Sequence, residues 1–101
     1  MLTSQRFLDA LPAELRPVVQ QAAERLRDLP PRLRQVARAI GHVPKAIAKQ
    51  LQLSEKSVRT YINELYRRLG LRDDCQAYPL DRAVIVMLAV VLYTLTYDDL
   101  L

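Results

Sequence analysis

The sequence feature that most limits the possible folds is a tight break, at Leu53-Ser54, between two short helical patterns. After the break, apolar residues recur at steps of three and four: Val58, Ile62, Leu65 and Leu69. Such steps place side chains on one face of a helix. Ser54 is a residue type that caps helix starts, and Gly70 is a residue type that ends helices. The stretch therefore predicts two helices joined by a tight turn, the second spanning residues 54–69.

The opposite face of this second helix is polar and cationic. Its residues recur at the same steps: Lys56, Arg59, Thr60, Asn63 and Arg67. Lys and Arg can bond guanine edges or phosphate, Asn can bond adenine twice, and a Thr methyl can contact thymine. Glu55 and Glu64 fall to the side, so we expect no carboxylate to interrupt this face. An ordinary solvated helix face is the simpler alternative, but the tight turn in front favours a helix that enters the DNA major groove.

The charge is concentrated on the same two helices. Residues 42–72 contain seven Lys or Arg against two acidic residues, whereas residues 73–101 contain one Arg against five. Nucleic acid is the partner that this pattern favours, because neutralising phosphates releases counterions and supplies most of the non-specific affinity. A helix on anionic lipid would combine basic and apolar residues in one element, and here they are separated.

From Leu29 to Ala77, about half of the chain, the sequence resembles the DNA-binding domain of the LuxR/GerE family. The matching residues keep the family's spacing without gaps: Gly41, Lys45, Ile47-Ala48, Leu51, Leu53-Ser54, Ser57-Val58-Arg59, Ile62, Leu69 and Ala77. The sequence departs from residues common in the family at Leu33, Pro44, Ala46 and Tyr61. The resemblance implies a helix-turn-helix fold and promoter binding, with RNA polymerase as a further expected partner.

The composition of the whole chain favours an all-α fold, since it has two Gly, no Trp and many helix-forming residues. Its 101 residues suffice for one domain with a modest core. We expect an N-terminal helical extension at 1–29, a LuxR-like helix-turn-helix core at 30–77 and an apolar C-terminal helix at 78–101. Apolar spacing and prolines predict the earlier helices over 4–11, 13–29 and 31–40. We interpret the extension as a buttress, with a part in a dimer contact as the alternative.

The segment from Ala83 to Tyr97 is the most apolar part of the chain. As a helix its fifteen residues would span about 22 Å. A bilayer requires roughly 20 apolar residues, so this segment is too short to cross one. A helix that is apolar all round must be covered all round, and a monomer of this size has difficulty enclosing it. We therefore predict a homodimer, in agreement with the family resemblance. Its contacts are expected at Val84, Met87, Leu88, Val91, Leu92 and Leu95.

The leading hypothesis is a cytoplasmic transcription regulator that binds double-stranded DNA sequence-specifically as a dimer. Base contacts are expected from Lys56, Arg59, Thr60 and Asn63. Phosphate contacts are expected from Lys45, Lys49, Ser54, Ser57, Tyr61, Arg67 and Arg72. The single Cys75 suits a reducing compartment, and one His with one Cys offers no metal site, so no metal or cofactor is predicted.

Two other classes of function are weighed against this hypothesis. The same fold could be a protein-interaction module, either similar to a sigma-factor region 4 or an inhibitor that forms mixed dimers through the apolar helix. A steep loss of DNA affinity with salt would distinguish a DNA-binding protein from such a module. An enzyme is the weakest class, because the sequence has no Gly-rich phosphate loop and no paired carboxylates within an apolar stretch.

Overall fold

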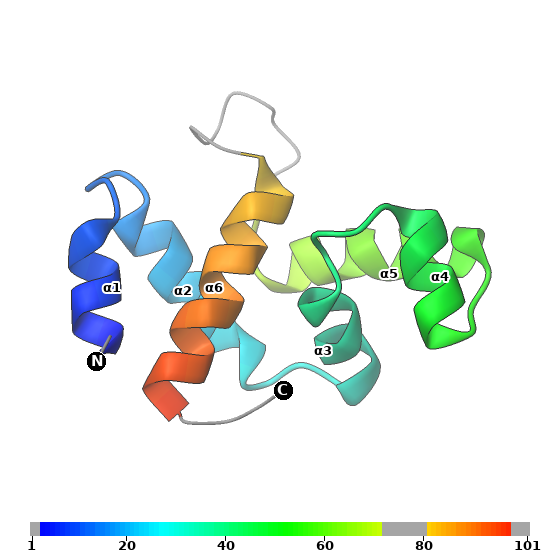
Figure 1. The fold of residues 1–101 in the computed structure, drawn as a ribbon, viewed down its shortest axis with the longest axis horizontal. Helices are drawn as coiled ribbons and strands as arrows, with labels where there is room; N and C mark the ends of the chain where they lie inside the picture. Colours follow the sequence, from blue (N-terminus) through cyan, green and yellow to red (C-terminus); the bar gives the residue numbers. More distant parts are fainter. Residues whose placement is uncertain (1–2, 72–80, 98–101) are drawn as a thin grey trace.

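The computed structural model describes residues 3–71 and 81–97, and within these ranges it contains α-helices and no strand (Figure 1). The helices are α1 (Ser4–Ala10), α2 (Arg16–Leu26), α3 (Pro31–Arg38), α4 (Pro44–Leu51), α5 (Glu55–Arg68) and α6 (Arg82–Tyr97). The predicted all-α class is confirmed. None of these helices is both long and apolar enough to cross a membrane.

α4 and α5 form a helix-turn-helix that is closed by hydrogen bonds at the turn. Gln52 ends α4 in the left-handed conformation, with φ 59°, and the Leu53 N–H donates to the carbonyl of Ala48 at 2.8 Å. α5 then begins at the Ser54 cap, whose side-chain oxygen accepts a hydrogen bond from the Ser57 N–H at 3.1 Å. The second helix predicted at 54–69 is thus observed with Ser54 and Leu69 as its caps.

α5 is held by α3 and α4, which both pack against it. A small apolar cluster of Ala39, Ile47, Ala48 and Val58 joins α4 to α5 near the turn. Further along, Leu65 and Leu69 enter the main core together with Leu33 and Val36 of α3. The apolar face of α5 is therefore buried along its length, which fixes the opposite face toward solvent.

α1, α2 and α6 form the other half of the molecule. α6 packs mainly along α2 and also contacts α1 and α3 (Figure 1). The core between them includes Val19 and Leu26 of α2 and Ile85, Val86 and Ala89 of α6. Because the same core also contains Leu65 and Leu69, both halves of the chain share one hydrophobic interior.

Although α6 is apolar on all sides in sequence, it is buried on one side only. Leu92, at 3% exposure, belongs to the core of the single chain. Val84, Met87 and Val91 are exposed to 37%, 46% and 42%, and Leu88 and Leu95 are partly exposed. Among the residues predicted to form a dimer, Leu92 is thus occupied by intrachain packing, whereas the others border an uncovered apolar stripe.

Candidate nucleic-acid interface

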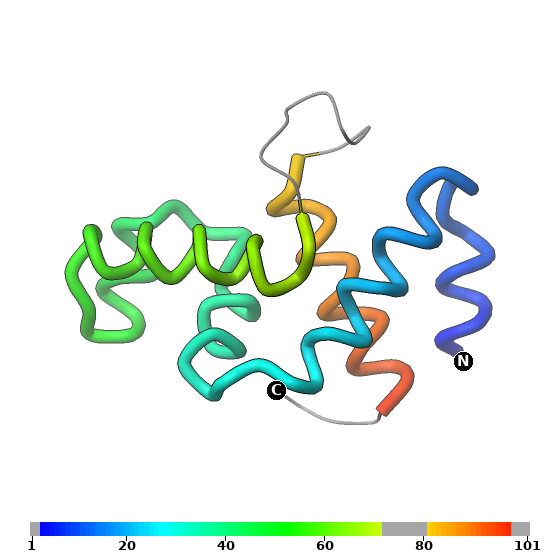
Figure 2. Tube along the Cα trace, turned by 180° about the vertical axis from the view of Figure 1, so that it is seen from behind, coloured from blue at the N-terminus to red at the C-terminus, as the bar shows by residue number. Residues whose placement is uncertain are grey.

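α5 presents two opposed faces, one buried and one exposed. Val58 and Leu65 are fully buried on the inner face. The residues of the outer face are all exposed: Lys56, Arg59, Thr60, Asn63 and Arg67. We call these five residues the α5 ridge. In Figure 2, α5 lies toward the viewer, on the near side of its packing partner α4.

Hydrogen bonds within α5 restrict what some ridge residues can offer. The Thr60 hydroxyl donates to the Lys56 carbonyl at 3.1 Å, which leaves the Thr60 methyl as its outward group. Ser54 and Ser57, both predicted to contact phosphate, have their hydroxyl oxygens 3.0 Å apart within the helix cap. They lie at the start of α5, where backbone N–H groups favour anions.

Two carboxylates reach arginines of the ridge from its side. The Glu55 carboxylate lies 3.8 Å from the Arg59 guanidinium. Glu64 accepts hydrogen bonds from Arg67 and Arg68, with 2.9 Å between its Oε1 and the Arg68 Nε. These hydrogen bonds lower the pKa of the Glu64 carboxyl below its ordinary value of 4.5. The expectation that no carboxylate would interrupt this face therefore missed these pairs, although their three- and four-residue spacing could have indicated them.

Three of the other predicted contact residues lie on α4 or on the side of α5. Lys45 and Lys49 are exposed on α4, and Tyr61 is partly buried with its ring against the main core. Pro44, at the start of α4, lines a shallow open groove together with Arg59, Ile62 and Asn63. The fold thus brings α4 beside the middle of the ridge. Arg72, Cys75 and Ala77 lie outside the described residues.

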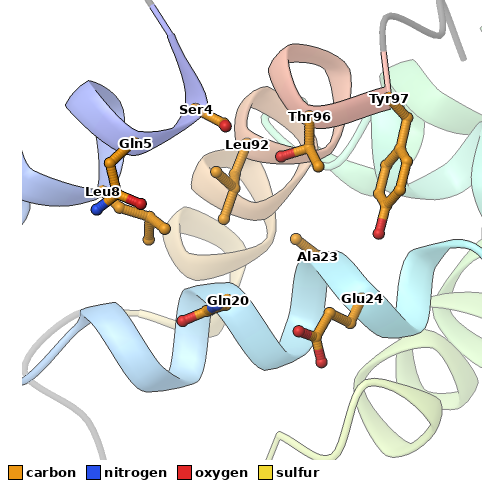
Figure 3. A pocket seen from close by; sticks show the side chains of 9 residues that line it. All are labelled: Ser4, Gln5, Leu8, Gln20, Ala23, Glu24, Leu92, Thr96 and Tyr97. Carbon is orange, nitrogen blue, oxygen red and sulfur yellow. The ribbon is translucent and has the colours of Figure 1, made fainter.

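The described residues contain no cluster of His, Cys, Asp or Glu that could hold a metal ion. A separate cleft of about 180 Å³ lies between α1, α2 and α6, with Leu8, Ala23 and Leu92 among its lining residues (Figure 3). Its volume is below the roughly 300–1,000 Å³ of small-molecule sites, so we assign no ligand to it.

A cationic helix held outward by a helix-turn-helix is the arrangement found in DNA-binding proteins of this class. A family model described as "GerE: Bacterial regulatory proteins, luxR family" matches residues 29–80, just over half of the chain. The chain therefore belongs to the luxR family of bacterial regulatory proteins. The match includes α3, α4 and α5, and α1, α2 and α6 lie outside it. Comparisons with curated proteins and with solved structures gave no match.

Proposed function

We propose that this protein regulates transcription by binding double-stranded DNA sequence-specifically, as a homodimer, with α5 in the major groove. The observation that carries the proposal is the division of α5 into a buried apolar face and the exposed α5 ridge. α5 has 14 residues, and an α-helix with its side chains is about 10–12 Å in diameter, which fits a major groove about 12 Å wide. Membership of the luxR family supports DNA binding and regulation, and it makes RNA polymerase a further proposed partner in the cytoplasm.

Within this proposal, Arg59 and Asn63 at the middle of the ridge are the main base contacts. Both line the groove beside Pro44, and neither has a hydrogen bond that would prevent contact with a base edge, although Arg59 must leave Glu55. Lys56 and the Thr60 methyl contact the groove edge. Phosphate contacts come from Lys45, Lys49, Ser54, Ser57, Tyr61, Arg67 and Arg72.

The uncovered stripe on α6 supports the homodimer. Val84, Met87 and Val91 follow one another at steps of three and four, with Leu88 and Leu95 beside them. Each large apolar side chain left in water forfeits about 1.5–3 kcal/mol of burial free energy. Pairing two copies through this stripe would cover it. The two α5 helices would then enter successive major grooves about 34 Å apart.

We further propose that residues 1–29, 30–77 and 78–101 are three parts of a single domain. The three parts share one hydrophobic core, which supports a single domain in which no part folds independently. Val19 of α2, Leu65 of α5 and Ile85 of α6 all belong to that core.

The test is selection of bound fragments from a random duplex pool, with the mass in solution measured in parallel. Asn63→Ala and Arg59→Ala should each cost about 1–3 kcal/mol of binding free energy and relax the preference at one base position. Lys49→Ala should weaken all sequences alike and reduce the salt slope by about 0.9 for each protomer engaged.

Gln50→Ala is the matched control, because Gln50 is an exposed amide that lines a groove with α3 and is not part of the ridge. It should bind as the parent does. If Asn63→Ala and Arg59→Ala also bind as the parent does, α5 is not the recognition helix. If the parent binds no duplex, the protein-interaction module becomes the better explanation of the exposed stripe on α6.

A further inference from the structure

We infer that the DNA-contacting surface extends beyond the family domain onto α2, where Arg25 binds the phosphate backbone beside the site of α5. The inference rests on the proposed function. It assigns a contact to the N-terminal extension, which lies outside the luxR match at residues 29–80.

The Arg25 side chain lies at the end of the α5 ridge. A Cβ added to Gly70 would overlap the Arg25 Nη1 and lie 3.1 Å from its Cζ, so the guanidinium rests against the backbone of Gly70. Gly70 is the second residue after Arg68, the last residue of α5. Arg25 therefore supplies a positive charge just beyond the C-terminal end of α5.

α2 and α5 also lie on the same face of the molecule. In Figure 1, α6 lies in front of α2 and the segment that leads into α4 lies in front of α5. In Figure 2 the order is reversed, and α2 and α5 are both toward the viewer. Arg25 and Gln21, one helical turn apart, are exposed on α2. A duplex seated against α5 would thus also pass α2, which carries these two exposed hydrogen-bond donors.

Arg25 is available for this contact, whereas Arg16 and Arg27 of the extension are engaged. The Arg16 guanidinium donates to the carbonyls of Leu8, Asp9 and Leu11 at the end of α1. Arg27 lies over the Tyr97 ring, 4.8 Å from its centroid. Within residues 3–71 and 81–97, Arg25 is exposed and has no carboxylate within ion-pair distance.

The dimensions of B-DNA favour a phosphate rather than a base as the partner of Arg25. Asn63 lies five residues before Arg68, the last residue of α5, about 7.5 Å along the helix axis, while the major groove is about 12 Å wide. When Asn63 contacts base edges, Gly70 and the guanidinium above it lie near the margin of the groove, where the phosphates are. Arg binds phosphate oxygens through paired charge-assisted hydrogen bonds.

Arg25 could instead serve only to stabilise the end of α5, because cations near helix C-termini are favourable. The experiment must separate the two roles. We would measure the affinity of the parent and of Arg25→Gln for a mixed-sequence duplex as a function of salt concentration. The urea midpoint of each protein reports the stability independently.

For each protomer engaged, Arg25→Gln should reduce the salt slope by about 0.9 and weaken binding roughly fivefold at about 0.15 M salt. Arg25→Lys should keep the slope. Arg6→Gln, the matched control, removes an equally exposed charge of the extension from α1 and should keep both slope and affinity. In the parent, ethylation of the phosphates beside the C-terminal end of α5 should interfere with binding. With Arg25→Gln this interference should weaken, whereas interference at the phosphates contacted from α4 should persist.

If Arg25→Gln has the same salt slope as the parent, the inference is overturned. If its urea midpoint is then also lower than that of the parent, Arg25 serves only the stability of α5. Should Arg25→Gln fail to fold, the absence of interference at the phosphates beside the C-terminal end of α5 in the parent overturns the inference. These results differ from failure of the proposed function, in which the parent itself would not bind duplex.

Discussion

The hydroxyl of Thr60 is engaged inside α5 by its hydrogen bond to the Lys56 carbonyl. A threonine in this state offers a partner its methyl group, and the thymine methyl is the base feature that such a group contacts. Asn63, in contrast, keeps donors and acceptor for a base, and it is exposed next to Arg59. The hydrogen bond within α5 therefore leaves Thr60 with an apolar group to offer, whereas Asn63 offers polar groups.

Two substitutions of Thr60 separate these contributions. Thr60→Val keeps a methyl in place and should bind the selected DNA within about twofold of the parent, because the hydroxyl makes no contact with a base. Thr60→Ser removes the methyl and should cost about 0.8 kcal/mol, roughly fourfold in Kd. Titration of a labelled duplex measures both. A loss in Thr60→Val larger than that in Thr60→Ser would show that the hydroxyl, rather than the methyl, contacts DNA.

Glu64 gives the stability of α5 a predictable pH dependence. Hydrogen bonds from Arg67 and Arg68 lower the pKa of its carboxyl in the folded protein below 4.5. The carboxylate therefore contributes stability above the pKa of the unfolded chain, and this contribution is lost as the pH falls through the lower folded value. Between neutral pH and about pH 3, the urea midpoint of the parent should fall further than that of Glu64→Gln. Equal decreases in the two proteins would contradict this assignment.

At the scale of elements, the end of α5 depends on the conformation of Gly70. Its φ is 74°, and the Leu71 N–H donates to the Tyr66 carbonyl at 2.9 Å, which closes the helix. A side chain here would face both the strain of a left-handed residue and the guanidinium of Arg25. α5 is thus terminated at a position that favours glycine for two reasons, its left-handed backbone and the close approach of Arg25.

Gly70→Ala should therefore destabilise the protein by about 1–2 kcal/mol from the left-handed backbone, with a further loss from the displaced Arg25. Combining it with Arg25→Ala should remove the second part, which a double-mutant cycle in urea would measure. Gly41→Ala is the control, because its Cβ would meet only the flexible end of Met87 at 3.3 Å. A cost at Gly41 equal to that at Gly70 would argue against the role of backbone strain.

The ends of α5 could be predicted because Ser54 and Gly70 act through local hydrogen bonds and dihedral angles. The left-handed conformation of Gln52 could not be predicted, because Gln does not favour this conformation and the turn imposes it. The position of Arg25 against Gly70 could not be predicted either, because this contact joins residues that are far apart in the sequence. The sequence of α6 is apolar on all sides, so it did not indicate which side of this helix would pack on α2.

At the scale of the whole molecule, adjacent residues of α6 have opposite environments. Val91 is exposed and Leu92 is buried. If two copies pair through the exposed stripe, Val91→Lys should lower the mass in sedimentation while leaving the urea midpoint of the monomer near that of the parent. Leu92→Ala should instead cost about 2–5 kcal/mol of stability. A parent that sediments as a monomer at every concentration would remove the homodimer from the proposal.

The packing of α6 along α2 has a consequence for how the chain acquires its fold during synthesis. α2 leaves the ribosome long before α6, so its apolar side, including Val19 and Leu26, remains without its main cover in the meantime. The helices α3 to α5 follow one another directly and can assemble from near neighbours, which is the faster kind of assembly. The nascent chain can thus form the small cluster of Ala39, Ile47, Ala48 and Val58 first, whereas the main core shared by both halves is complete only with α6. Holdase chaperones would find their target in the apolar surface that still awaits α6.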